Sequence, residues 1–368
     1  MTDELLEYSV VYTDRALNHM SPTFMRVMTD LSDMLKTLYR ADAVALIPGG
    51  GTYAMEAVAR QLATDKSVLV VRNGWFSYRW TQILEQGNIT SKAEVLLADC
   101  VNDGTTPVYA PHDIDKVVAH IHANKPQIVF APHVETASGI MLTDDYIKAL
   151  AQATHEVGGL LVIDCIASGC VWLDMQDLGI DMLISAPQKG FSSTPCAGMV
   201  MMSSQAVQAV DSSTSTSFAA DLKAWLNIMR AYEHGGHAYH ATMPTDGLKQ
   251  LRDVLIESRD VGFETLKSAQ IELGQAILAV LTDKGVLSVA APKYQAAGVI
   301  VCHTDRDDVH KGAAFRDVGV QIAAGVPLKV GEPNSYKTFR LGLFGLTKLT
   351  DIDKAVNDFK LAADKVFG

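Results

Sequence analysis

Hydrophobic residues follow two alternating patterns along roughly the first 240 positions. Short runs that are apolar throughout predict buried strands at 43–47, 67–72, 94–98, 127–131, 160–164, 182–185 and 198–202. Between most of these runs, apolar residues recur at helical spacing, near 52–63, 76–86, 112–123 and 144–157. Strands that are apolar on both faces and separated by helices are typical of a mainly parallel sheet covered on both sides. The pattern therefore predicts an α/β fold with a doubly wound, seven-stranded sheet.

The pattern changes near residue 245. The polar stretch 212–217 has no apolar periodicity, and after Pro244 a helical pattern runs to about Asp283. Strand-like runs follow at 286–290, 298–303 and 338–343, and we expect a final helix to begin at Thr350. We therefore expect an N-terminal arm over 1–20, a large domain over 21–245 and a small C-terminal α/β domain over 246–368.

Charge and composition narrow the class of protein. The 368 residues include 31 Lys and Arg against 42 Asp and Glu, a formal net charge of −11. An acidic surface repels nucleic acid and anionic lipid, so neither nucleic acid nor a membrane is an expected partner. Five cysteines without Cys-x-x-Cys spacing indicate reduced thiols and a cytoplasmic location. With 48% hydrophobic residues, the chain resembles a well-cored enzyme.

Two tracts at the ends of predicted strands are candidates for ligand binding. The glycines of Pro48-Gly-Gly-Gly-Thr52 lie between a strand and a helix, where backbone amides and the helix N-terminus can bind an anion. A tight turn capped by Thr52 is the alternative. Asp164 ends an apolar strand, and ligands of open α/β sheets lie at that edge. The alternative for Asp164 is a cap of the following turn.

Two basic residues are further candidates. Lys189 follows a predicted strand and precedes small and polar residues, which core packing explains poorly. A partly desolvated lysine amine has a lowered pKa that suits Schiff-base chemistry. The alternative, which the sequence also allows, is a solvated lysine in a loop. Arg340 lies inside an apolar strand, where its guanidinium requires an anionic partner. That partner is either a ligand carboxylate or an internal acidic side chain.

Seven short motifs place these residues in a family. They are Gly50-Gly-Thr-Tyr-Ala-Met-Glu56, Asn73-Gly-Trp-Phe76, His133-Val-Glu-Thr136, Asp164-Cys-Ile-Ala-Ser168, Pro187-Gln-Lys-Gly190, Tyr239-His-Ala-Thr242 and Arg340-Leu-Gly342. In this order they resemble the class V aminotransferases of pyridoxal phosphate (PLP) fold type I, particularly the alanine/serine–glyoxylate or pyruvate branch. The resemblance runs from Asn18 to the C-terminus. It implies a large PLP-binding domain and a small C-terminal domain.

The resemblance also implies roles for individual residues. Lys189 would bind PLP through a Schiff base and move the substrate α-proton, and Asp164 would pair with the pyridine nitrogen. Arg340 would bind the substrate carboxylate. The other implied cofactor-binding residues are Gly50, Gly51, Thr52 and Gln188 at the phosphate, Phe76 (or Trp75) and Ile166 on the two ring faces, Thr136 near the ring oxygen, and Tyr239 and Thr242 from a partner subunit.

The implied function is a transaminase that moves an amino group from a small α-amino acid to a small 2-oxo acid. Alanine, serine or aspartate is the expected donor and glyoxylate or pyruvate the acceptor, in a homodimer with shared active sites and without a metal. The alternatives are a 2-aminoethylphosphonate–pyruvate transaminase or a PLP-dependent lyase such as a cysteine desulfurase, for which Cys302 in an apolar strand pattern is poorly suited. The family's N-terminal Pro-Gly-Pro is absent from 8–14, so the acceptor preference stays open.

Overall fold

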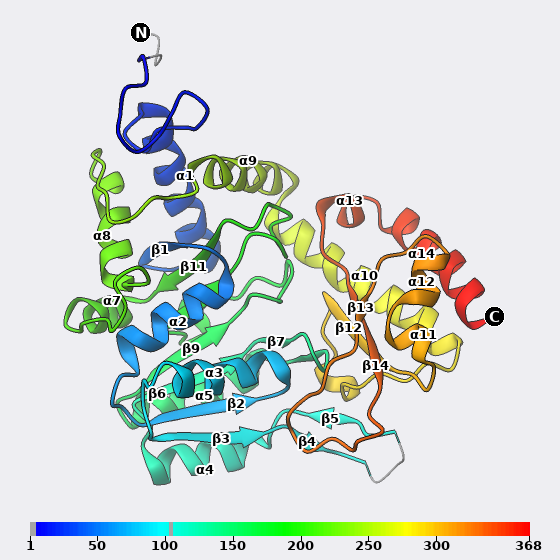
Figure 1. Ribbon diagram of the computed structural model, residues 1–368. Helices are drawn as coiled ribbons and strands as arrows, with labels where there is room; N and C mark the ends of the chain where they lie inside the picture. The colour runs from blue at the N-terminus through cyan, green and yellow to red at the C-terminus, as the bar shows by residue number, and fades with distance from the viewer. Residues whose placement is uncertain (1–4, 103–105) are drawn as a thin grey trace.

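A seven-stranded sheet forms the centre of the first two thirds of the chain (Figure 1). The computed structural model describes residues 5–102 and 106–368. The strands lie in the order β1-β11-β10-β9-β6-β2-β3. Their bounds are β1 Ala43–Pro48, β2 Val68–Arg72, β3 Ala93–Leu97, β6 Ile128–Pro132, β9 Leu160–Asp164, β10 Met182–Ser185 and β11 Ala197–Met202. All seven predicted strands are confirmed.

Strand direction brings the functional tracts to one edge of this sheet. Strand β11 runs antiparallel to both of its neighbours, β1 and β10, and every other neighbouring pair is parallel. Strand β1 therefore points the same way as β9 and β10. The carboxyl ends of β1, β9 and β10 lie at the same edge, which is where an open α/β sheet binds its ligands.

Helices pack against the strands as the periodicity predicts. The four expected helices are α2 (Gly51–Leu62), α3 (Trp75–Gln86), α4 (Ile114–Asn124) and α5 (Asp144–Glu156). Helix α2 packs on β11, α3 on β2 and α5 on β9. Four more helices lie in the described residues of this part: α1 (Pro22–Tyr39), α6 (Met175–Leu178), α7 (Ser204–Asp211) and α8 (Leu222–Glu233). The polar stretch 212–217 joins α7 to α8.

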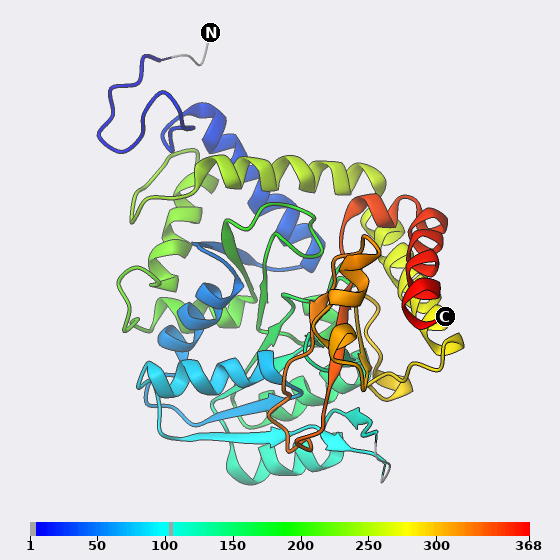
Figure 2. The same cartoon turned by 45° about the vertical axis from the view of Figure 1, so that its right-hand side comes forward.

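The long helical pattern after Pro244 is two helices, so the prediction of one was wrong. Helix α9 (Thr245–Val261) packs on α1, and α10 (Phe263–Asp283) packs on α14 (Ile352–Phe367). They meet at Gly262, whose φ of 103° is in the left-handed region and ends the first helix. Figure 2 shows α9 crossing from the α1 side of the molecule toward the C-terminal part.

The C-terminal part contains a small antiparallel sheet of order β12-β14-β13. Its strands are β12 (Val299–His303), β13 (Ala323–Ala324) and β14 (Thr338–Gly342). The strand expected at 286–290 is absent from this described segment, which forms only the isolated bridges Ser288–Cys302 and Tyr109–Ala290. The final helix α14 begins at Ile352, two residues after the start expected at Thr350, and is capped by Asp351, whose side chain accepts the Lys354 N–H. Thr350 instead caps the end of α13 (Leu346–Leu349).

The remaining elements are short, and most lie in loops. They are β4 Asp99–Cys100, β5 Tyr109–Ala110, β7 Val134–Glu135, β8 Ile140–Met141, the 3₁₀ turn Pro292–Tyr294, α11 Asp307–His310 and α12 Ala313–Asp317. Within the described residues, no helix combines the length and the apolar character that crossing a membrane requires. The division into an arm over 1–20 and domains over 21–245 and 246–368 stays a prediction.

Candidate active site

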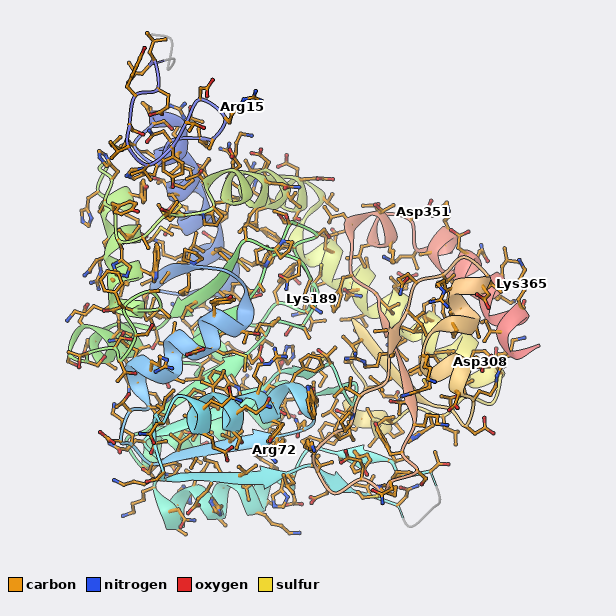
Figure 3. All side chains as sticks on the ribbon, viewed as in Figure 1. Arg15, Arg72, Lys189, Asp308, Asp351 and Lys365 are labelled. Carbon is orange, nitrogen blue, oxygen red and sulfur yellow. The ribbon has the colours of Figure 1, made fainter. Side chains whose placement is uncertain are left out.

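A cavity of about 210 Å³ lies at the carboxyl edge of the sheet. It is lined by Gly51, Thr52, Met55, Phe76, Arg79, Val134, Thr136, Asp164, Ile166, Ala167, Gln188 and Lys189. Figure 3 places Lys189 between this sheet and the C-terminal part of the chain. Two larger hollows, of about 480 and 520 Å³, lie on the C-terminal part and are lined by neither Lys189 nor Asp164.

The turn between β1 and α2 forms one end of the cavity. Gly50 is the N-cap of α2, and a Cβ on Gly51 would lie 2.3 Å from Ile166 Cδ1. A side chain at position 51 would therefore require the Ile166 side chain to move. Amides in the first turn of a helix have no intrahelical acceptor, so they are available to an anion. Gly50 itself adjoins the cavity without lining it.

Asp164 is buried at the end of β9. Its Oδ1 accepts the Ile166 N–H at 2.9 Å, and none of the described residues donates a hydrogen bond to Oδ2. Burial raises the pKa of this carboxyl to about 7, because the charged form is desolvated. A cationic donor at Oδ2 would restore the charged form.

Lys189 lies in the turn after β10, close to the C-terminal part of the chain. Its Nζ is 5.3 Å from the centre of the Phe344 ring. Burial, and then the nearby charge of Arg340, lower the pKa of this amine. The following residue must be glycine, because a Cβ on Gly190 would lie 2.1 Å from the Gly169 carbonyl oxygen. The backbone thus places an amine with a lowered pKa in the cavity.

Phe76 and Trp75, which the sequence left as alternatives, differ in position. Phe76 lines the cavity, whereas Trp75 contacts Tyr78 and lies beneath Lys329, whose Nζ is 5.7 Å from its ring centre. The Phe76 backbone N–H donates to Glu135 Oε1 at 3.1 Å. This contact anchors the start of α3 and with it the aromatic ring.

The predicted residues divide into two groups. Eight line the cavity together: Gly51, Thr52, Phe76, Thr136, Asp164, Ile166, Gln188 and Lys189. Arg340 is near it, because its guanidinium carbon is 5.5 Å from the centre of the Phe76 ring. Tyr239 and Thr242 do not line it; the two hydroxyls lie 3.1 Å from each other, and Tyr239 is 52% exposed.

Four lining residues were missed from the sequence: Met55, Arg79, Val134 and Ala167. Of these four residues, Arg79 is the one with a charged side chain. It follows Phe76 by three positions on a predicted helix, a spacing that puts both side chains on one face. This spacing is the feature of the sequence that could have identified Arg79 as a site residue.

A mainly parallel sheet with a lysine, an aspartate and a glycine turn at its carboxyl edge is the arrangement of PLP-dependent transferases of fold type I. The family model "Aminotransferase class-V" matches residues 1–342, and the chain belongs to this family. It is a PLP-dependent aminotransferase.

Individual relatives agree with this assignment. A 2-aminoethylphosphonate–pyruvate transaminase of Paraburkholderia xenovorans is 28% identical over 319 residues, which cover 85% of this chain and 81% of that protein. An alanine–glyoxylate aminotransferase from Nostoc sp. has a similar structure, with a TM-score of 0.80 at 20% identity over 96% of this chain and 89% of that one. An aspartate aminotransferase from Thermus thermophilus has a TM-score of 0.77 at 23% identity, over 95% and 93%.

The cavity has the groups that PLP requires. Lys189 has an amine for the cofactor aldehyde, Asp164 has an unpartnered oxygen that could pair with a protonated ring nitrogen, and the α2 N-terminus with Thr52 could bind the phosphate. Phe76 and Ile166 supply apolar surface for the ring. The residues present therefore fit the cofactor.

Proposed function

We propose that this enzyme transfers the amino group of a small α-amino acid to a small 2-oxo acid, glyoxylate or pyruvate. The observation that carries the proposal is Arg340, a partly buried guanidinium beside the cavity. Its Nε donates to the Ala324 carbonyl at 2.8 Å, which orients the group. None of the described carboxylates forms an ion pair with it. A substrate carboxylate would supply the missing partner through two parallel hydrogen bonds.

The catalytic residues proposed are Lys189 and Asp164. Bound PLP supplies an aldehyde and an electron-accepting ring for amino transfer. Lys189 Nζ, with its lowered pKa, takes a proton from the substrate carbon and returns it. Asp164 holds the ring-nitrogen proton at Oδ2. Arg340 orients the substrate, which aligns the reacting C–H bond with the amine.

The other cofactor contacts keep the roles that the resemblance implies. We propose Gly50, Gly51, Thr52 and Gln188 for the phosphate, Phe76 and Ile166 for the ring faces and Thr136 for the ring oxygen. Their common cavity supports these roles, apart from Gly50, which adjoins it.

We also propose a homodimer in which Tyr239 and Thr242 complete the partner's phosphate site. Their exposed position outside their own cavity supports an action across subunits. The N-terminal arm also supports an interface, because its apolar side chains Leu5, Leu6 and Val10 are at least 85% exposed in a single subunit. Tyr12 ties the arm to the Tyr239 segment by donating to the Met243 carbonyl at 3.1 Å.

A cytoplasmic location is proposed from the thiols. All five cysteines are free, and Cys165, Cys170, Cys196 and Cys302 are buried.

Cys302 lies within β12, and burial raises the pKa of its thiol to about 12, which opposes a role as a desulfurase nucleophile.

A second candidate is 2-aminoethylphosphonate–pyruvate transamination, which is favoured by the similarity to the Paraburkholderia xenovorans transaminase of that activity. The test of both is a donor and acceptor survey of the PLP-loaded enzyme. Alanine is paired with glyoxylate, and serine, aspartate and 2-aminoethylphosphonate are each paired with glyoxylate and with pyruvate. Turnover with an α-amino acid supports the first proposal, and turnover with the phosphonate alone overturns it in favour of the second.

The role of Lys189 has its own test. Borohydride reduction of the loaded enzyme should attach the cofactor to the Lys189 peptide, and Lys189→Ala should abolish both this adduct and multiple turnover. An adduct on another lysine contradicts the assignment.

A further inference from the structure

Arg79 is a partly buried cation in the cavity wall to which none of the seven sequence motifs gives a role. Its Nη1 donates to Thr52 Oγ1 at 2.9 Å, which joins α3 to the first turn of α2. Its guanidinium carbon is 5.1 Å from the centre of the Phe76 ring. Arg79 therefore touches the residue proposed for the phosphate and the residue proposed for the ring.

Arg79 forms no ion pair in the described part of the chain, although burial raises the pKa of Asp164 and the charge of Arg79 offsets a part of that rise. No described carboxylate forms an ion pair with it, whereas Arg60 on the neighbouring helix α2 pairs with Glu56 at 2.7 Å. A guanidinium has five N–H donors, and this one uses a single donor on a neutral hydroxyl. The remaining donors are free for an anion in the cavity.

The bond to Thr52 also determines what the threonine can donate. A hydroxyl has one hydrogen and two acceptor positions. Because Thr52 Oγ1 accepts the Arg79 N–H, its own hydrogen stays available. Thr52 lies at the start of α2, where free backbone amides already favour an anion. Three kinds of donor thus converge on one end of the cavity.

We propose that Arg79 belongs to the phosphate-binding set for PLP. It binds a phosphate oxygen directly and holds Thr52 so that the threonine hydroxyl donates to the same dianion. The proposal rests on the cofactor site proposed around Lys189 and adds a residue to it. A substrate phosphonate has the same tetrahedral dianion, but the contact with Thr52 and the α2 N-terminus favours the cofactor phosphate.

The test compares PLP with pyridoxal, which lacks the phosphate, in equilibrium dialysis against the apoenzyme. The measured quantity is the ratio of the two dissociation constants, because a general loss of folding or of ring contacts changes both alike. In Arg79→Gln the preference for PLP should fall by about 10- to 100-fold, as expected for a lost charge-assisted bond.

Arg72→Gln is the matched control. Arg72 is also a partly buried arginine near the start of α3, but it donates to Thr81 Oγ1 and the Lys329 carbonyl and does not line the cavity. Figure 3 shows Arg72 apart from Lys189. The preference of Arg72→Gln for PLP over pyridoxal should stay within about threefold of the wild-type value, a change below about 1 kcal/mol. An equal fall in both variants would indicate net charge alone and overturn the proposal.

Other outcomes also decide the question. An unchanged preference in Arg79→Gln, or equal weakening of PLP and pyridoxal, overturns the proposal. If that variant binds neither, Arg79→Met is measured instead, because it keeps most of the aliphatic stem and loses the charge; an unchanged preference there also overturns the proposal. A raised KM for 2-aminoethylphosphonate with an unchanged preference would assign Arg79 to the substrate. None of these measurements needs turnover of an α-amino acid, so failure of the proposed function is separately visible.

Discussion

The Glu135 carboxylate and Ser77 are joined by two hydrogen bonds, from the Ser77 N–H at 2.8 Å and from its hydroxyl at 2.6 Å, both to Oε2. The other oxygen accepts the N–H groups of Phe76 and Ala137. Glu135 is fully buried at the N-terminus of α3, where the helix dipole favours a negative charge. Gly74 makes room for it, since a Cβ there would lie 2.7 Å from Glu135 Cγ.

We expect Glu135→Gln to lower both stability and cofactor affinity. Either orientation of the amide turns its NH₂ group toward two donors, at a cost of about 1–3 kcal/mol. Phe76 would then shift from the cavity, and the dissociation constant of PLP should rise. Thermal unfolding and PLP dialysis measure the two effects. The control is Glu85→Gln, the same exchange on an exposed residue of α3, which should change neither.

Asp164 should make the stability of the apoenzyme depend on pH. Its pKa is raised to about 7, so between the unfolded value and pH 7 the folded chain binds more protons than the unfolded chain. The free energy of unfolding therefore falls as the pH rises through this range, by at most about 4 kcal/mol.

Asp164→Asn removes this titration while keeping an oxygen for the Ile166 N–H. Without PLP, the variant should melt above wild type at pH 8, with a smaller difference at pH 5. With PLP, the wild type should gain more stability than the variant, because only a carboxylate pairs with a protonated ring nitrogen. Parallel melting curves of the two apoproteins across this pH range would refute the explanation.

Much of the fold was predictable because burial on both faces leaves an unmistakable pattern. All five residues of β9 are buried, and the sequence Leu-Leu-Val-Ile-Asp shows it directly. The chemistry was predictable where a charged residue ends such a run, as Asp164 does. A carboxylate is conspicuous after four apolar residues.

The features that were missed depend on contacts distant in sequence. Arg79 looks like a solvated helix residue until α2 and α3 are brought together, which places Thr52, 27 positions away, under its guanidinium. Gly262 inside a helical pattern is tolerated in many helices, and only its left-handed φ reveals the break. The run 286–290 is apolar because Val289 and Ala290 are buried. It does not form a strand that pairs continuously with a neighbouring strand.

A mixed dimer tests whether Tyr239 and Thr242 act across subunits. One subunit carries Lys189→Ala and the other carries Tyr239→Phe with Thr242→Ala. If the residues act in trans, one site of each heterodimer is intact and about half of the wild-type activity per dimer returns. If they act within their own chain, both sites are defective and no activity returns. Sedimentation of the wild type as a monomer would also contradict the dimer.

Arg340→Lys should greatly reduce turnover of α-amino acids although the charge is kept. Lysine cannot make two parallel bonds to a carboxylate, nor can it keep the Nε bond to the Ala324 carbonyl that orients the group. A lost pair of this kind is worth roughly 2–5 kcal/mol, or about 30- to 4,000-fold in kcat/KM. The dissociation constant of PLP should stay near wild type, because Arg340 does not line the cofactor cavity.

The substrate itself supplies the control for Arg340. An amine without an α-carboxylate has nothing to place against the guanidinium, so its conversion of bound PLP to the amine form, measured without a 2-oxo acid, should be insensitive to Arg340→Lys. Loss of this half-reaction with both kinds of amine would mean that Arg340 acts through Phe76, whose ring centre lies 5.5 Å from its guanidinium carbon, rather than through the substrate. The opposite outcome is a variant that keeps kcat/KM within about threefold of wild type for every productive α-amino acid, a change below about 1 kcal/mol. That result would show that Arg340 does not bind the substrate.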